Sequence, residues 1–81
     1  MNKNAKYTMS TTYDEFNLFF EYDSGAYITV YINNKPCDVI NVYDYEAGKS
    51  TIINVGDFNN ACNEYIDYTT NYDLHNLFMY S

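Results

Sequence analysis

The sequence contains no arginine and only four lysines, against eleven aspartate and glutamate residues, so 81 residues carry a formal charge of −7. A protein that binds nucleic acid directly needs a basic surface that neutralises phosphates, and docking on an anionic membrane needs one as well. We therefore expect neither nucleic acid nor a membrane as a direct partner.

Long apolar runs are also missing. No stretch approaches the roughly 18 residues of a transmembrane helix. The charged N-terminus, Met-Asn-Lys-Asn-Ala-Lys, is not followed by the apolar segment of a signal peptide. We expect a soluble cytoplasmic protein, and the length suits one small domain with one core.

Catalytic signatures are absent. The chain has three glycines and one histidine, and it lacks the glycine-rich phosphate loops, GxSxG and HExxH. Nothing in the spacing brings His75 to Cys37 or Cys62, and pairs of carboxylates occur by chance in so acidic a chain. We predict a protein that is not an enzyme and uses no cofactor.

The two cysteines give no metal motif. Cys37 and Cys62 have no Cys-x-x-Cys partner, and a single histidine does not complete a zinc site. Without a signal peptide, two small buried thiols are favoured over a disulfide. The sequence alone does not decide whether the two cysteines meet.

Aromatic residues are abundant, with eleven tyrosines and five phenylalanines, which distinguishes this chain from disordered acidic proteins. From Phe16 to Tyr22 apolar side chains recur at every second position, which favours a strand over 16–22. Thr12 and Glu15 have the spacing of a capping box, which would instead favour a short helix. We predict the strand and keep the helix over residues 12–22 as the alternative.

The clearest strand is 26–32, which is rich in β-branched and aromatic residues. Asn33–Pro36 has the composition of a turn, and 38–45 alternates as a further strand. After a second turn at 46–50, a short strand is expected over 51–55. Successive strands joined by short turns predict an antiparallel meander.

The C-terminal third has helical periodicity. After a predicted N-cap at Asp57, the spacing of Phe58, Ala61, Cys62 and Tyr65 describes an amphipathic helix. The same spacing resumes at Leu74 after a break near 69–72, so one kinked helix or two short ones would fit. The predicted class is α+β, with a three- or four-stranded antiparallel sheet and the C-terminal helix or helices packed on one face. We expect residues 10–81 to form this single domain and residues 1–9 to be a flexible tail.

The acids are unevenly distributed and stand next to tyrosines. No lysine occurs between Tyr7 and Asn34 or after Ser50. A carboxylate accepts guanidinium bonds and a tyrosine ring offers a cation–π face, so such pairs suit a partner rich in Arg and Lys. An acidic face that only keeps the protein soluble is the alternative. The predicted partner-binding residues are Glu21, Asp23, Asp44, Glu46, Glu64, Asp67 and Asp73, with Tyr22, Tyr45 and Tyr68 stacking beside them.

In its short length, acidity, richness in Tyr and Asn and predicted sheet-plus-helix fold, the chain resembles phage-encoded anti-CRISPR proteins. The stretch from Asn63 to Tyr68, continuing to Asp73-Leu74, resembles a segment of the antirestriction DNA mimics. The resemblance implies an inhibitor of a basic, nucleic-acid-binding defence protein, such as a Cas effector, whose DNA binding it blocks with an acidic, tyrosine-rich surface. It would act in the cytoplasm of the bacterial host, encoded by a phage or another mobile element. An immunity protein that caps a nuclease toxin, and a phage structural or assembly domain, are the alternatives.

Overall fold

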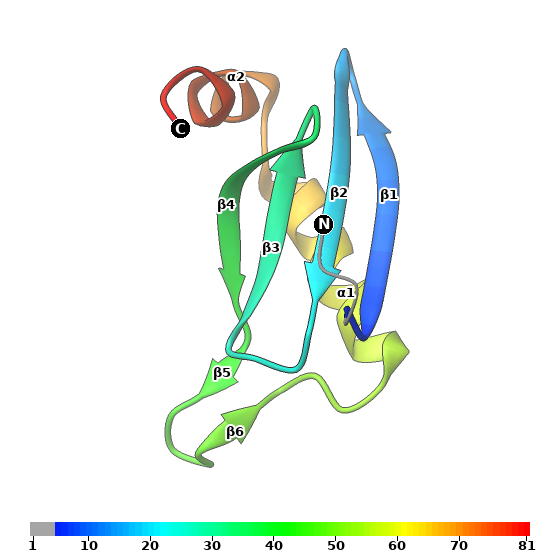
Figure 1. Ribbon diagram of the computed structural model, residues 1–81, viewed down its shortest axis with the longest axis vertical. Helices are drawn as coiled ribbons and strands as arrows, with labels where there is room; N and C mark the ends of the chain where they lie inside the picture. The colour runs from blue at the N-terminus through cyan, green and yellow to red at the C-terminus, as the bar shows by residue number, and fades with distance from the viewer. Residues whose placement is uncertain (1–4) are drawn as a thin grey trace.

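Four strands pair in chain order to form one antiparallel sheet in the computed structural model, which describes residues 5–81 (Figure 1). The strands are β1 (Tyr7–Tyr13), β2 (Phe16–Tyr22), β3 (Tyr27–Ile32) and β4 (Lys35–Asn41). Two helices follow, α1 (Val55–Tyr68) and α2 (Asn71–Met79). The predicted α+β class, with an antiparallel sheet and C-terminal helices, is confirmed.

Two tight turns set the sheet register. Asp14 and Glu15 join β1 to β2, and Asp14 adopts a positive φ of 52°. Asn33 and Asn34 join β3 to β4 with φ values of 51° and 70°, as in the type I′ turns that match the twist of a hairpin. The helix considered for residues 12–22 does not form, and β4 begins inside the turn expected at 33–36.

The first strand corrects the expected N-terminal tail. Residues 7–9 are part of β1 and pair with residues 20–22 of β2, so the tail prediction is wrong for them, while residues 1–4 lie outside the described part. The Tyr7 ring stacks on Tyr22 at 6.3 Å between centroids and contacts Phe58 at 5.7 Å. These aromatic contacts give β1 an apolar side that its own sequence shows only weakly.

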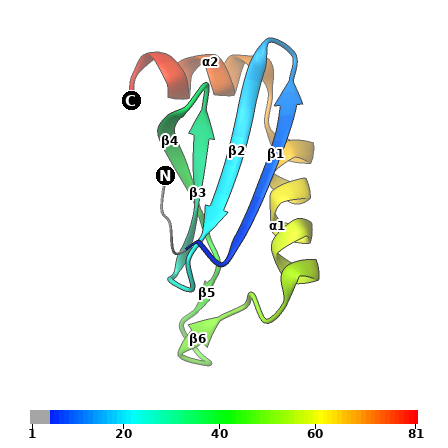
Figure 2. The same ribbon diagram turned by 45° about the vertical axis from the view of Figure 1, so that its right-hand side comes forward.

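The predicted strand over 51–55 is also wrong. A small hairpin of β5 (Tyr43–Asp44) and β6 (Lys49–Ser50) extends below the main sheet, and helix α1 already begins at Val55 (Figures 1 and 2). The helix starts early because Asn54 is its N-cap: the Asn54 side chain accepts a bond from the Asp57 N–H, and the Asp57 carboxylate bonds back to the cap backbone. Asp57 is therefore the third residue of the helix and not its cap.

The break near 69–72 separates two helices. Thr69 ends α1 and the Thr70 hydroxyl caps α2 by accepting from the Asp73 N–H at 3.1 Å. Helix α1 runs diagonally across one face of the sheet, and α2 crosses the end of that face beside β4 (Figures 1 and 2). The core between these layers is formed by Phe16, Leu18, Phe20, Tyr22, Ile28, Val30, Ile32, Val42, Ile52, Phe58, Cys62 and Leu74.

Candidate functional site

The fold separates the ten predicted partner-binding residues into three groups. Tyr22 and Glu21 are buried, with 2% and 7% of their surface exposed. Tyr22 points toward the helices, and its hydroxyl donates to Ser50 Oγ at 2.7 Å. The prediction that it stacks on a partner is therefore wrong, because alternation along β2 turns it into the core.

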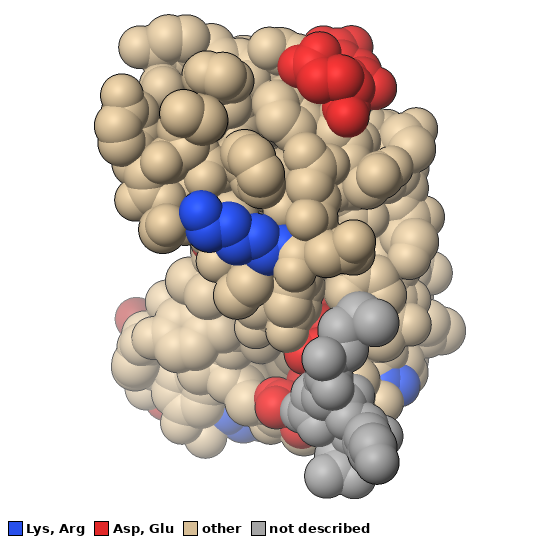
Figure 3. All heavy atoms as spheres, turned by 45° about the horizontal axis from the view of Figure 1, so that its top comes forward, with Lys and Arg blue, Asp and Glu red and all other residues tan. Residues whose placement is uncertain are grey.

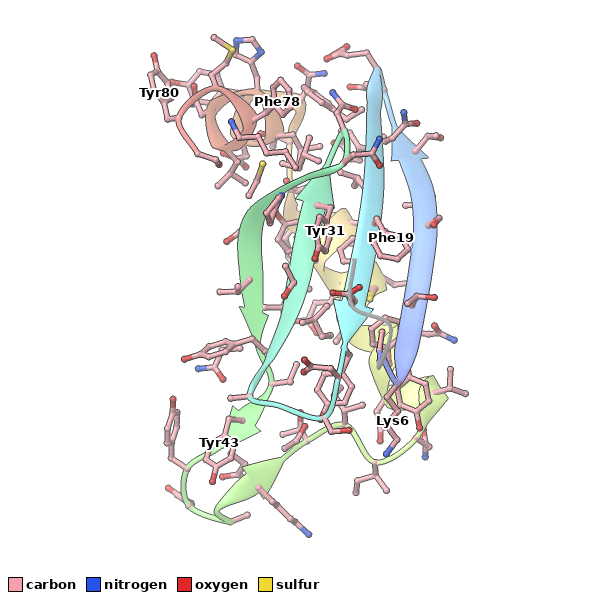
Figure 4. All side chains as sticks on the ribbon, viewed as in Figure 1. Lys6, Phe19, Tyr31, Tyr43, Phe78 and Tyr80 are labelled. Atoms are coloured by element: carbon pink, nitrogen blue, oxygen red, sulfur yellow. The ribbon has the colours of Figure 1, made fainter. Side chains whose placement is uncertain are left out.

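Glu21 lies on the opposite face of the sheet from Tyr22. Its carboxylate accepts a hydrogen bond from the Tyr31 hydroxyl at 3.1 Å, and Tyr31 packs edge-on against Phe19 (Figure 4). Burial, together with the hydrogen bond and charge of Glu21, raises the pKa of Tyr31. Glu21 is therefore part of the sheet structure and does not present a free charge to a partner.

The second group lies at the end of the molecule that carries the small hairpin. Asp23, Asp44, Glu46 and Tyr45 are all exposed there, and the Tyr45 ring packs on Tyr43 at 4.9 Å between centroids. Asp44 Oδ1 accepts from the backbone N–H groups of Glu46 and Ala47, so this carboxylate mainly fixes the turn between β5 and β6. Of these acids, Glu46 has a carboxylate that accepts no hydrogen bond from the described residues.

The third group lies on the helices. Glu64 and Asp67 of α1 and Asp73 of α2 are exposed, and so is Tyr68, with 81% of its surface accessible. Within residues 5–81 none of these three carboxylates forms an ion pair. Glu64, Asp73 and Tyr68 open onto one groove, whereas Asp67 lies outside it.

The groove has a volume of about 1210 Å³ and separates β4 from the two helices. Apolar side chains line its floor, namely Ile40, Val42, Ala61 and Leu77. Carboxylates and tyrosines line its rim, namely Asp38, Glu64, Asp73, Tyr65, Tyr68 and Tyr80. None of the described residues that line it is basic. The combination can hold a cation that carries an apolar stem, as the side chains of Lys and Arg do.

Asp38 and Tyr65 are the ordered centre of this rim. The Tyr65 hydroxyl donates to Asp38 Oδ2 at 2.9 Å, and Asp38 Oδ1 accepts from the Val39 N–H at 2.8 Å. Burial first, then the hydrogen bond and charge of Asp38 and the nearby charge of Asp73, raise the pKa of Tyr65. Two carboxylates therefore act on one tyrosine hydroxyl, which stays neutral.

The sequence-based prediction omitted Asp38, and it assigned Tyr65 to the core. A signal for Asp38 was present, because it shares the inward face of its strand with Ile40 and Val42. Its position follows from the pairing of β4 with β3, where a register shift lies between Val30 and Tyr31. Lys35, the nearest lysine in sequence, is engaged elsewhere: its Nζ donates to the Phe78 carbonyl at 3.1 Å.

A further acidic pair lies outside the predicted set, at the tip of the β1–β2 hairpin. Asn71 Nδ2 donates to Asp14 Oδ2 at 3.1 Å and to Glu15 Oε1 at 2.6 Å, which joins this tip to the start of α2. The Tyr13 hydroxyl adds a bond to the Thr69 carbonyl. Figure 3 shows one compact acidic patch over this tip, and a lysine side chain and further acidic atoms lie lower on the same face.

The two cysteine thiols differ in their surroundings. Both cysteines are free, and burial raises the pKa of Cys62 to about 12. The Cys37 thiol lies at the groove and donates to the Lys35 carbonyl. A thiol with so high a pKa is protonated at neutral pH, so Cys62 acts as a small core residue.

Comparisons with known proteins give no match among protein-family models, curated proteins or solved structures. In the part of the chain that the structure describes, no helix has the length and apolarity needed to span a membrane. Residues 5–81 also contain no group of three His, Cys, Asp or Glu side chains that could hold a metal ion. The groove between β4 and the two helices is the candidate site considered below.

Proposed function

We propose that this protein is a non-enzymatic inhibitor of the anti-CRISPR type, which binds a basic, nucleic-acid-binding defence protein such as a Cas effector and blocks its access to DNA. The observation that carries the proposal is the groove between β4 and the helices, whose rim has three carboxylates and no cation. Groups that bind phosphate in an effector are Lys and Arg side chains, and these are the groups that such a rim attracts.

The groove supplies each part that a bound arginine or lysine needs. The apolar floor accommodates the aliphatic stem, the carboxylates of Glu64 and Asp73 receive the charged head, and the ring of Tyr68 lies on the same rim. Asp38 is already held by Tyr65, so its position is fixed before a partner arrives. Fixed acceptors lose less entropy on binding than free ones.

The carboxylates of the helices are also spaced like a sparse phosphate row. Glu64 and Asp67 stand three residues apart on α1, or about 4.5 Å along its axis, while one strand of DNA carries a phosphate for every 3.4 Å or so of the duplex axis. The match is limited to a few charges, so the inhibitor would replace DNA at selected basic residues and not along a whole duplex.

The test measures competition with DNA on a panel of purified Cas effectors, by fluorescence anisotropy of a labelled target duplex. The wild-type chain should displace DNA from one effector, with an affinity that falls as salt rises. The double variant Glu64→Lys/Asp73→Lys should lose more than tenfold in affinity. Glu46→Lys, a reversal on the distant hairpin, is the control and should stay within about twofold.

Three outcomes would contradict the proposal. Equal affinity of the wild-type chain and the double variant would remove the groove from the interface. A failure to displace DNA from any effector of the panel would remove the inhibitory function. Tight binding to a secreted nuclease in the same assay, without binding to effectors, would identify an immunity protein instead.

A further inference from the structure

The two edges of the sheet differ in how well they are protected against pairing with another strand. At the β4 edge, Pro36 has no N–H, the register shifts between Val30 and Tyr31, and Asp38 Oδ1 occupies the Val39 N–H. Each of these features blocks an added strand. The β1 edge has none of them: Tyr7–Tyr13 contains no proline and no charge, and it pairs with β2 in unbroken register.

The hydrogen bonds of Asn17 show which backbone groups β1 leaves free. The Asn17 N–H donates to Asn33 Oδ1 at 2.9 Å, and the Asn17 carbonyl accepts from the Asn33 N–H at 2.8 Å. Both groups of Asn17 therefore face β3, so Thr12, its partner in β1, points its own N–H and carbonyl away from β2. By alternation the same holds for Ser10 and Thr8, and all three residues are exposed.

The sequence of this free edge is nearly palindromic. Tyr7-Thr8-Met9-Ser10-Thr11-Thr12-Tyr13 reads almost the same in both directions around Ser10. We propose that β1 pairs antiparallel with β1 of a second copy of this chain, around a two-fold axis at Ser10, to give a continuous eight-stranded sheet. The outward backbone N–H and carbonyl groups of the two β1 strands then face each other: Ser10 lies opposite Ser10 of the second copy, and Thr8 lies opposite its Thr12.

Charge fixes this register among the alternatives. With Ser10 on the axis, Lys6 stands opposite Asp14 of the second copy, and the symmetry repeats the pair at the other end of β1. Lys6 lies just before β1, at the end far from the hairpin tip that carries Asp14 (Figure 4). A shift by two residues in either direction would place Lys6 opposite Thr12 or Phe16, where no carboxylate is available. Opposite charges across a strand pair stabilise it, so the central register is preferred.

An apolar contact is available beside the same edge. The ring contact between Tyr7 and Phe58 places the first turns of α1 next to the start of β1, as Figures 1 and 2 also show. Ile53 and Val55, at this end of α1, are exposed although they are large and apolar. A second copy paired along β1 comes alongside this end of the helix, where it can cover them.

Light scattering coupled to size-exclusion chromatography, over a hundredfold range of protein concentration, measures the pairing. We expect a wild-type dimer that dissociates on dilution, and a monomer for Ser10→Pro with an unchanged circular dichroism spectrum. Proline removes only the outward N–H at this position, so the bonds between β1 and β2 remain. Ser10→Ala is the matched control and should remain dimeric. A wild-type monomer at every concentration, or a dimer that survives Ser10→Pro, would overturn the proposal.

Cross-linking tests the register without relying on proline. In a Cys37→Ser background, Ser10→Cys should be joined into a covalent dimer by a short bifunctional thiol cross-linker, because directly opposed residues of a hydrogen-bonded pair have Cα atoms about 5.5 Å apart. Thr8→Cys alone should not, whereas a mixture of Thr8→Cys and Thr12→Cys chains should. A covalent dimer of Thr8→Cys alone, with none from Ser10→Cys, would exclude a two-fold axis at Ser10. Since β1 is the edge opposite the groove, monomeric Ser10→Pro should still compete with DNA, so each proposal can fail without the other.

Discussion

Replacing Leu74 by alanine measures how firmly α2, which forms one wall of the groove, is held on the sheet. Leu74 is the one buried residue of this nine-residue helix, and Leu77 and Phe78 are only half-buried. So short a helix is not stable by itself in water, and its structure depends on this packing. The truncation should cost about 2–5 kcal/mol, the range for a buried leucine that leaves a cavity. A domain of this length has about 4–12 kcal/mol of stability in total, so the loss is a large fraction of it.

Urea unfolding followed by circular dichroism gives the free energy of unfolding, and amide hydrogen exchange shows which elements become less stable. In thermal unfolding followed by the same signal, the midpoint temperature should fall by about 10 °C or more. Amides of α2 should lose protection before those of β2 and β3, since the helix can detach while the sheet persists. Met79→Ala, on the exposed side of α2, is the control and should change stability by less than about 0.5 kcal/mol. A Leu74→Ala variant within 1 kcal/mol of wild type would refute the packing of α2 described here.

Three further predictions follow from single contacts. Tyr22→Phe should cost about 0.5–1.5 kcal/mol in urea unfolding, because it removes the bond to Ser50 but keeps the ring, and it should leave partner affinity unchanged. Asn54→Ala should cost about 0.5–2 kcal/mol in the same assay and fray the start of α1, as seen by hydrogen exchange. The free energy of unfolding should fall as the pH rises above 9, because the unfolded chain loses the Cys62 proton near pH 9 whereas the folded chain keeps it to about 12. At pH 8 a thiol reagent should modify Cys37 much faster than the buried Cys62. Equal labelling of both thiols in the native protein, or a flat pH dependence up to pH 11, would contradict the burial of Cys62.

The parts of the fold that could be predicted are those whose pattern is contained in one segment. The strand at Phe16–Tyr22 is predictable because a large apolar residue stands at every second position, and α1 because its apolar residues recur every three or four positions. β1 was not, because Thr and Ser separate its few large side chains and its apolar side is completed by Tyr22 and Phe58 from other elements.

The end of the sheet illustrates two local signals in conflict. Residues 51–55 have the β-branched composition of a strand, yet the capping box formed by Asn54 and Asp57 starts a helix at Val55. The side-chain hydrogen bonds of the capping box therefore outweigh the β-branched composition, and residue 55 begins a helix. Both signals are present in the sequence, but their relative strength depends on the packing of Phe58 in the core.

The candidate site was only partly predictable, because it depends on which acids remain exposed. Glu21 and Glu64 are equivalent in the sequence, since each lies next to a tyrosine. One is covered on the sheet and the other opens onto the groove. The groove itself results from the break between the helices and from the register shift of β4, which bring Asp38 toward Tyr65 from 27 positions away.

The bonds from Asn71 to the tip of the first hairpin also constrain when the protein can fold during synthesis. They join residues 56 and 57 positions apart, so the tip of the first hairpin gains these bonds only after the start of α2 has been made. The ribosome makes the four strands before the helices, and the apolar side of the sheet stays uncovered until residues 55–79 have emerged. A nascent chain that stalls before Val55 would present Phe20 and Ile28 to chaperones and proteases, because neither the helical cover nor the bonds from Asn71 yet exist.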